Sequence, residues 1–204
     1  MKEAGLPDGV MNVVNQLLDA AFGSSGERCM ALSVAVAVGE AASDALVAKM
    51  VAAMVNLKVG EFNDSSNDFG PVITSQHRDK VVGYINLAQE QGATIVVDGR
   101  NPQVEGYNDG LFIGGTLIDN VTPDMESYKE EIFGPVLQVV RVQTMQEAMD
   151  LIDAHEYGNG TCIFTRDGEA ARYFSDNIQV GMVGINLPLP VPVAYHSFGG
   201  WKRS

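Results

Sequence analysis

Residues 32–57 read LSVAVAVGEAASDALVAKMVAAMVNL. The first seven, residues 32–38, form an apolar, valine-rich run that is typical of a strand buried on both faces of a parallel sheet. After Gly39 the pattern changes, and residues 40–57 place apolar side chains on one broad helical face. A buried strand followed directly by a long helix is the unit from which helix-covered parallel sheets are built. This stretch therefore predicts an α/β fold.

The rest of the chain continues the alternation of strand and helix patterns. Strands are predicted at residues 94–97, 111–118, 136–142, 161–165 and 181–186, and helices at residues 14–22, 78–91, 145–155 and 169–177. Residues 188–204 are rich in proline and glycine and predict an extended loop. The alternation indicates a mostly parallel sheet covered by helices, and 204 residues fit one large domain.

The charge balance limits the class of partner. Asp and Glu outnumber Lys and Arg by 26 to 13, which gives a net charge of −13. Such a surface repels phosphate backbones and anionic lipids, so we expect a small-molecule ligand and neither nucleic acid nor membrane as partner. Two cysteines are too few for a disulfide framework. They predict free thiols in a reducing compartment, the cytoplasm, or an organelle matrix if a transit peptide has been removed.

Cys29 follows the small and flexible residues 23–26, GSSG, which separate the first helix pattern from the strand at 32–38. Such a turn can present a sulfur atom to a cleft, and the positive charge of the adjacent Arg28 favours the reactive thiolate. A lone cysteine is more often a buried and inert residue. The local sequence leaves both alternatives open, a nucleophile or a packing residue.

Three further segments contain residues that could form a site. Residues 130–135, EEIFGP, place two carboxylates and an aromatic ring before a strand, where a carboxylate could bind sugar hydroxyls or simply be solvated. Residues 197–202, SFGGWK, form a glycine-rich turn that we interpret as structural, because no helix follows to bind a phosphate. Asn186 ends a strand pattern and is either a turn former or a site residue.

The remaining thiol and imidazole groups give no site signal. His77, His155 and His196 have no metal-ligand spacing, so we expect no metal and interpret them as surface or packing residues. Cys162 lies inside a strand pattern and is interpreted as a core residue.

Three of these segments occur in the order found in the aldehyde dehydrogenase superfamily. Residues 22–29, FGSSGERC, resemble its nucleophile segment, and residues 130–135 resemble its best-known downstream motif. Asn186 followed by residues 197–204, SFGGWKRS, resembles its closing motif. The likeness runs from Gln16 to Ser204 without an obvious gap.

Two short stretches indicate a subfamily. Residues 26–33, GERCMALS, and residues 187–192, LPLPVP, resemble the CoA-acylating methylmalonate-semialdehyde dehydrogenases. This resemblance implies NAD-dependent oxidation of methylmalonate semialdehyde or malonate semialdehyde through a thioester on Cys29. Coenzyme A would then take up the acyl group as propionyl-CoA or acetyl-CoA, with loss of carbon dioxide.

The resemblance also assigns expected roles to individual residues. Cys29 is the nucleophile, and its backbone N–H helps to hold the oxyanion. Arg28 binds the substrate carboxylate, since a guanidinium offers two parallel donors to two oxygens. Glu131 binds the nicotinamide ribose hydroxyls, and Phe133 packs near the nicotinamide. A homo-oligomer is expected as in the family.

The N-terminal residues depart from the family pattern. Residues 4–14, AGLPDGVMNVV, resemble a segment deep inside the family's cofactor-binding domain, yet they run directly into residues 15–18, which resemble the helix before the nucleophile. We therefore expect residues 1–14 to be a remnant of the cofactor domain and residues 15–204 to be the catalytic domain. Because most of the NAD-binding segment is then missing, little or no turnover is expected from this chain alone.

Three other functions stay open at this point. The chain could belong to another semialdehyde dehydrogenase, with a different carboxylate-bearing aldehyde as substrate. It could be a non-catalytic truncated fragment that only folds and associates. It could also be a thiol hydrolase, although no histidine lies in a recognisable dyad motif with Cys29.

Overall fold

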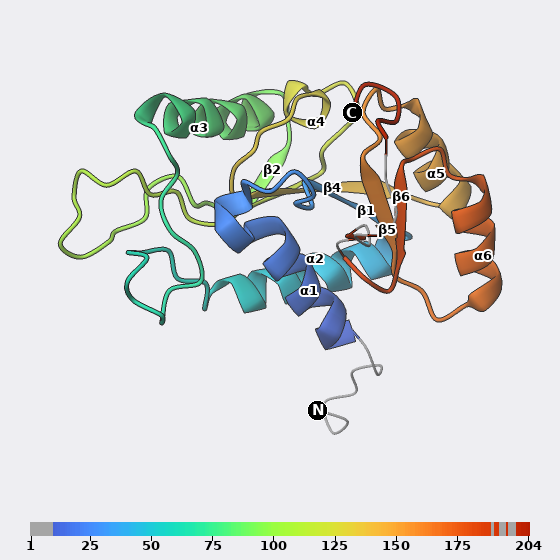
Figure 1. The fold of residues 1–204 in the computed structure, drawn as a ribbon, viewed down its shortest axis with the longest axis horizontal. Coiled ribbons are helices and arrows are strands. Elements are labelled where there is room, and N and C mark those ends of the chain that lie inside the picture. Colours follow the sequence, from blue (N-terminus) through green and yellow to red (C-terminus); the bar gives the residue numbers. More distant parts are fainter. Residues whose placement is uncertain (1–9, 189, 192–194, 196–198) are drawn as a thin grey trace.

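The computed structural model describes residues 10–188, 190, 191, 195 and 199–204, and for residues 10–12 it describes the backbone alone. The helices, shown in Figure 1, are α1 (Val10–Phe22), α2 (Glu40–Met54), α3 (Ser75–Glu90), α4 (Glu126–Lys129), α5 (Met145–Ala154) and α6 (Gly168–Asn177). The strands are β1 (Val34–Val38), β2 (Thr94–Val97), β3 (Thr116–Asp119), β4 (Val136–Val142), β5 (Gly160–Ile163) and β6 (Met182–Ile185). The α/β fold and the mostly parallel sheet are confirmed.

The strands form two sheets. The larger sheet has the order β1-β4-β3-β2, in which β1, β4 and β3 are parallel and β2 is antiparallel to β3. The smaller sheet pairs β5 with β6 in parallel. Because strand β1 pairs with β4, the chain directly after Cys29 lies beside the strand that follows residues 130–135. The topology therefore brings two of the sequence motifs to neighbouring strands.

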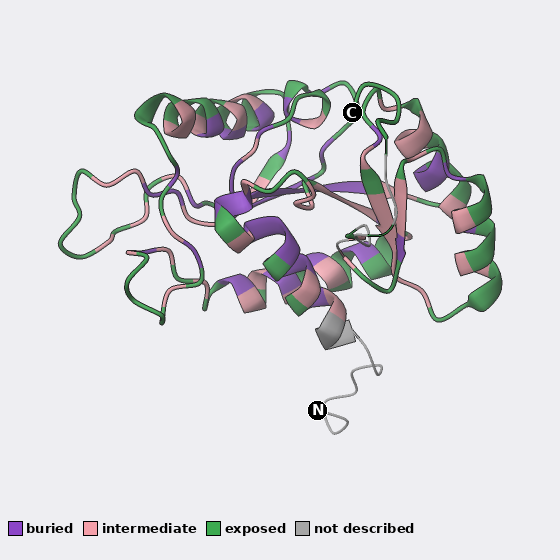
Figure 2. Ribbon diagram, viewed as in Figure 1, coloured by how far each residue is buried: buried purple, intermediate pink, exposed green. Residues whose placement is uncertain are grey.

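Helices cover both faces of the larger sheet, as Figures 1 and 2 show. Side chains alternate along β4, as expected for a strand buried on both sides. Leu137 and Val139 join the core cluster formed with α1 and α2. Val136 and Val140 join the cluster formed with α3. This alternation fixes which face of the sheet each side chain of β4 points to. It therefore also fixes on which side of the sheet residues 130–135, directly before β4, lie.

Between residues 111 and 129, the bounds of the predicted strand were wrong and one short helix was missed. The strand begins only at Thr116, because Gly114 N donates to Gly99 O at 2.7 Å and the two glycine backbones touch. This close loop contact replaces strand pairing. Helix α4 was not predicted, since four residues are too short to show a helical period. It lies against β4, where the buried Gln138 donates from Nε2 to Ser127 O at 2.8 Å.

Most of the other boundaries differ from the predictions by a few residues, whereas the strands at Thr94–Val97 and Val136–Val142 have the predicted bounds. Helix α1 begins at Val10 and therefore runs without a break through residues 14 and 15, where we placed a domain boundary. The boundary itself stays a prediction. Among the described residues of the chain, the helices are too short or too polar to span a bilayer.

Candidate active site

Cys29 lies in a turn that reverses the chain between α1 and β1, which we call the cysteine turn (residues 23–29). Ser24, Ser25 and Gly26 have φ values of 54°, 57° and 70°, so three consecutive residues are left-handed. This conformation is strained for the two serines. It is held by a hydrogen bond from Ser25 Oγ to Gly70 O, at 2.7 Å. The sequence GSSG predicted a break here, and the structure gives its geometry.

Cys29 is exposed at the end of this turn, so the alternative of a buried packing residue was wrong. Its carbonyl oxygen accepts a hydrogen bond of 2.8 Å from Nδ2 of Asn159, the residue directly before β5. No described residue accepts a hydrogen bond from the Cys29 N–H. The turn is thus fixed through the carbonyl, while the thiol and the amide remain available to a ligand.

Arg28 is exposed and folds back along α1. Its guanidinium lies against Gly23, and Nη1 is 3.5 Å from the carbonyl oxygen of Asp19, the outer limit of a hydrogen bond. Carbonyl groups at a helix C-terminus carry partial negative charge, which accounts for this position. Because the contact is weak and solvent-exposed, a carboxylate ligand could displace it.

Residues 130–135, which we call the glutamate turn, touch the cysteine turn through the backbone of Gly26 and Gly134. A Cβ placed on Gly26 would lie 2.1 Å from the carbonyl oxygen of Gly134, so only glycine fits at Gly26. Gly134 is equally crowded, since its Cβ would lie 2.6 Å from Val81 of α3. Glu131 is exposed, and Phe133 is left-handed with φ 58°. The structure therefore brings Cys29, Glu131 and Phe133 to one region.

His77 connects the same two turns and was missed by the sequence interpretation. Its Nε2 is 2.7 Å from the carbonyl oxygen of Phe133 and 3.3 Å from Oε1 of Glu27. Burial raises the pKa of Glu27, and the nearby His77 partly opposes this rise. No sequence signal marked His77, because its partners lie 50 and 56 residues away.

Asn186 is a turn former in the structure. It has φ 55°, and its side-chain amide forms two hydrogen bonds of 2.9 Å with the backbone N–H and carbonyl of Thr165. The described part of the closing motif is also structural. Lys202 Nζ donates to the carbonyl oxygens of Ile152, Asp153 and His155 at the C-terminus of α5. Ser197 and Phe198 lie outside the described residues.

The remaining described thiol and imidazole groups, those of Cys162 and His155, have no hydrogen bond to the cysteine turn or the glutamate turn. Burial raises the pKa of the half-buried Cys162 to about 11, consistent with a packing role. His155 donates from Nε2 to Tyr128 O, since its Nδ1 accepts from Tyr157 N. His196 lies outside the described residues. Neither described histidine forms a hydrogen bond with the Cys29 thiol, which gives no support to the thiol hydrolase alternative.

Two other features of the described residues do not mark a site. No cluster of three or more potential metal ligands occurs among them. A shallow depression of about 440 Å³ lies beside the C-terminal end of β4, near Arg141 and Glu147, and none of the predicted site residues lines it.

Fold and site together define an α/β domain that presents an exposed cysteine beside a glutamate-bearing turn. The model of the aldehyde dehydrogenase family matches residues 8–204. The chain belongs to the aldehyde dehydrogenase family.

The similar proteins carry semialdehyde dehydrogenase names. Malonate-semialdehyde dehydrogenase from Pseudomonas aeruginosa is 62% identical over 200 residues, which are 98% of this chain and 40% of that protein. The crystal structure of methylmalonate-semialdehyde dehydrogenase from Oceanimonas doudoroffii has a TM-score of 0.94 and 80% identity, covering 96% of this chain and 40% of that one. The expected likeness to this subfamily is confirmed, and the chain spans about 40% of the length of these relatives.

A more distant neighbour has a bound cofactor. Betaine aldehyde dehydrogenase from Staphylococcus aureus in complex with NAD+ has a TM-score of 0.90 and 31% identity, covering 96% of this chain and 38% of that one.

Proposed function

We propose that residues 15–204 form the thiol-bearing catalytic domain of an NAD-dependent, CoA-acylating dehydrogenase of malonate semialdehyde or methylmalonate semialdehyde. The names of the similar proteins support this class of substrate. The single structural observation in its favour is the contact between Gly26 and Gly134, because it joins the turn that bears the exposed Cys29 to the turn that bears the exposed Glu131.

Cys29 performs the covalent chemistry in this proposal. Its thiolate attacks the aldehyde carbon and forms a thiohemiacetal. The oxyanion of this intermediate accepts a hydrogen bond from the backbone N–H of Cys29. NAD, when bound, would supply the acceptor for the hydride of this carbon, and a thioester would remain on Cys29. The thiol of coenzyme A then attacks the thioester carbonyl, so the acyl group leaves as acyl-CoA and Cys29 is regenerated. Loss of the substrate carboxylate as carbon dioxide leaves the electron pair as an enolate beside the thioester carbonyl, and this carbon takes up a proton from solvent.

The other residues bind and orient. Glu131 is exposed and lies in the turn beside the thiol, where its carboxylate fits a diol such as the nicotinamide ribose. Phe133 follows two residues later in a left-handed conformation and packs near the nicotinamide. Arg28 leaves its weak contact with Asp19 to bind the substrate carboxylate. These residues supply only part of an NAD site, so this chain alone turns over little substrate.

The last step can be tested without NAD by running it in reverse. Propionyl-CoA is incubated with the purified chain, and the Cys29 peptide is examined by mass spectrometry. We expect a propionyl group on Cys29, free coenzyme A in equal amount, and neither in Cys29→Ala. An unmodified Cys29 at saturating propionyl-CoA contradicts the proposal. Continuous release of coenzyme A over many turnovers would instead identify a thioesterase.

The substrate class needs a second measurement. NADH formation is followed with malonate semialdehyde, methylmalonate semialdehyde and the uncharged propionaldehyde, each with NAD and coenzyme A. Any residual activity should favour the carboxylate-bearing aldehydes, and Arg28→Gln should abolish that preference. Clear NADH production at an ordinary enzymatic rate would overturn the expectation that this chain alone is nearly inactive.

A further inference from the structure

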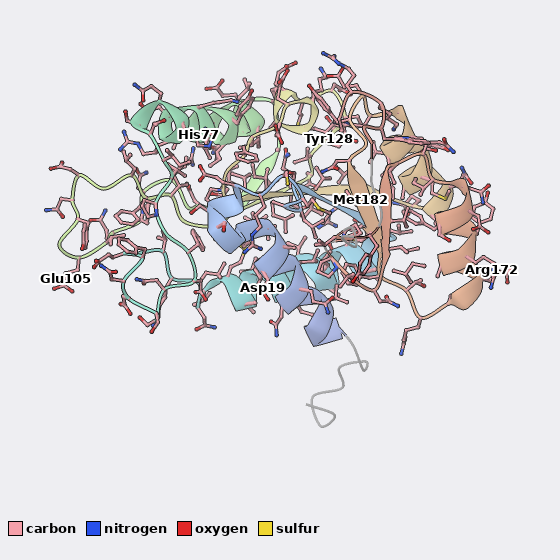
Figure 3. All side chains as sticks on the ribbon, in the orientation of Figure 1. Asp19, His77, Glu105, Tyr128, Arg172 and Met182 are labelled. Carbon is pink, nitrogen blue, oxygen red and sulfur yellow. The ribbon has the colours of Figure 1, made fainter. Side chains whose placement is uncertain are left out.

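His77 occupies a defined place between the cysteine turn and the glutamate turn. Its backbone N–H donates to Oγ1 of Thr74, the N-cap of α3, so His77 belongs to the rigid first turn of a 16-residue helix. Figure 3 labels His77 on α3. The imidazole is 21% exposed, and the Glu27 side chain beside it is 12% exposed. A group on a regular helix is better fixed than one on a loop, so this helix can serve as the reference for both turns.

The hydrogen-bond partners of His77 determine that its Nε2 carries a proton. The Phe133 carbonyl is an acceptor only, so the 2.7 Å contact requires Nε2 to carry the proton. The Glu27 carboxylate, 3.3 Å from the same nitrogen, then shares that proton as a second acceptor. Burial raises the pKa of Glu27, and the nearby His77 partly opposes this rise. One N–H group thus binds both turns.

This link adds something that the glycine contact lacks. Gly26 and Gly134 touch without any hydrogen bond between them, and a contact of this kind sets a minimum separation only. Phe133 has φ 58°, a conformation that costs free energy and persists only when its surroundings hold it. The hydrogen bond from His77 to the Phe133 carbonyl supplies such a restraint. The contact of His77 with Glu27 restrains the cysteine turn in the same way, two residues before Cys29.

We propose that His77 is a positioning residue that holds the cysteine turn and the glutamate turn at one fixed separation. It touches neither the thiol nor any reacting atom. It acts through Glu27 and through the Phe133 carbonyl, and so sets where the Cys29 N–H points relative to the thiol. This inference rests on the proposed function, because it assumes that acylation of Cys29 uses that N–H.

Two reactions of the same thiol test the inference. Acylation by p-nitrophenyl acetate forms a thioester on Cys29 and releases p-nitrophenolate through a tetrahedral oxyanion, so it needs the positioned N–H. Alkylation by iodoacetamide displaces iodide and forms no oxyanion, so it needs only an accessible thiolate. Both rates are measured at Cys29 in the wild-type chain, His77→Leu and His77→Gln. His155→Leu is the matched control, since His155 also donates from Nε2 to a backbone carbonyl.

We expect His77→Leu to slow acylation on the order of tenfold, equivalent to about 1.4 kcal/mol, with less than about a twofold change in alkylation. His77→Gln keeps an N–H at the same distance from the backbone and should restore acylation to within about threefold of wild type. His155→Leu should leave the ratio of the two rates unchanged. Equal slowing of both reactions, or failure of His77→Gln to restore acylation, would show a general folding defect and overturn the inference.

Hydrogen exchange keeps the inference separable from the proposed function. In His77→Leu the amides of residues 24–30 and 131–134 should exchange faster together, while those in β4 stay protected. Faster exchange in α3 alone contradicts a role that links the turns. If the wild-type chain is not acylated at Cys29 at all, the proposed function fails, and the exchange measurement still decides whether His77 joins the turns.

Discussion

Asn159 donates a hydrogen bond of 2.8 Å from Nδ2 to the carbonyl oxygen of Cys29, across 130 residues of sequence. This bond joins the start of β5 in the smaller sheet to the turn before β1 in the larger one. It is a direct restraint on the peptide that follows the thiol. The orientation of Cys29 therefore depends on how the two sheets pack.

Replacing the Asn159 donor should weaken the site. Asn159→Asp places a carboxylate oxygen against the Cys29 carbonyl, and two acceptors repel each other. We expect acylation of Cys29 by p-nitrophenyl acetate to fall on the order of tenfold. Asn177→Asp is the matched control, because Asn177 Nδ2 also donates at 2.8 Å to a backbone carbonyl, that of Tyr173 in α6. Equal rates in the two variants would contradict a special role for Asn159.

The two thiols should differ in reactivity across pH. Burial raises the pKa of Cys162 to about 11, so at pH 8 only about one molecule in a thousand carries the thiolate there. Cys29 is exposed, so its sulfur is accessible to the reagent. We expect iodoacetamide to modify Cys29 first at pH 8, with peptide mass spectrometry as the measurement. The Cys162 rate should rise about tenfold per pH unit up to about pH 11, and a flat profile would be inconsistent with its burial.

Gly26→Ala should disrupt the contact between the turns. The new Cβ would lie 2.1 Å from Gly134 O, and φ of 70° is unfavourable for alanine. We expect the free energy of unfolding to fall by about 2–4 kcal/mol in urea titrations. Gly83→Ala, in the middle of α3 with open space around it, should instead raise stability by about 0.5–1 kcal/mol. A neutral effect of Gly26→Ala would mean that the two turns separate readily.

Asp119 and Arg141 should make stability depend on acid pH. Desolvation raises the pKa of the nearly buried Asp119, but hydrogen bonds from Arg141 and from Asn120 N–H outweigh it, so the pKa is lowered overall. A carboxyl with a lowered folded pKa stabilises the protein above its ordinary pKa of about 3.9 and loses this contribution as pH falls through the folded value.

Asp119→Asn is therefore expected to lose about 2 kcal/mol of unfolding free energy at pH 7. The variant should also show a smaller drop in stability than wild type between pH 5 and pH 2, with urea titration at each pH as the measurement. Asp124→Asn, on an exposed loop, serves as the control. The ion pair is unimportant if Asp119→Asn matches that control at pH 7.

The sequence by itself determined the class of fold. The strand at Thr94–Val97 and the strand at Val136–Val142 were predicted to the residue, and the helix after Gly39 began where expected. These features are local, because side-chain period and glycine position act through the dihedral angles of neighbouring residues. The order of the three motifs along the chain likewise indicated the family before any contact was known.

Only the tertiary structure decided how the site is assembled. It exposed Cys29, placed Gly26 against Gly134, and turned Arg28 back along α1. It also showed the hydrogen bonds that His77 and Asn159 make to the two turns, which no pattern had marked, and those of Asn186 with Thr165. The position of Arg28 is a local feature. Each of the other features is a contact between residues far apart in sequence, or depends on how distant segments bury the residue. Their relative positions follow from the packing of helices on two faces of the sheet, which local periodicity does not encode.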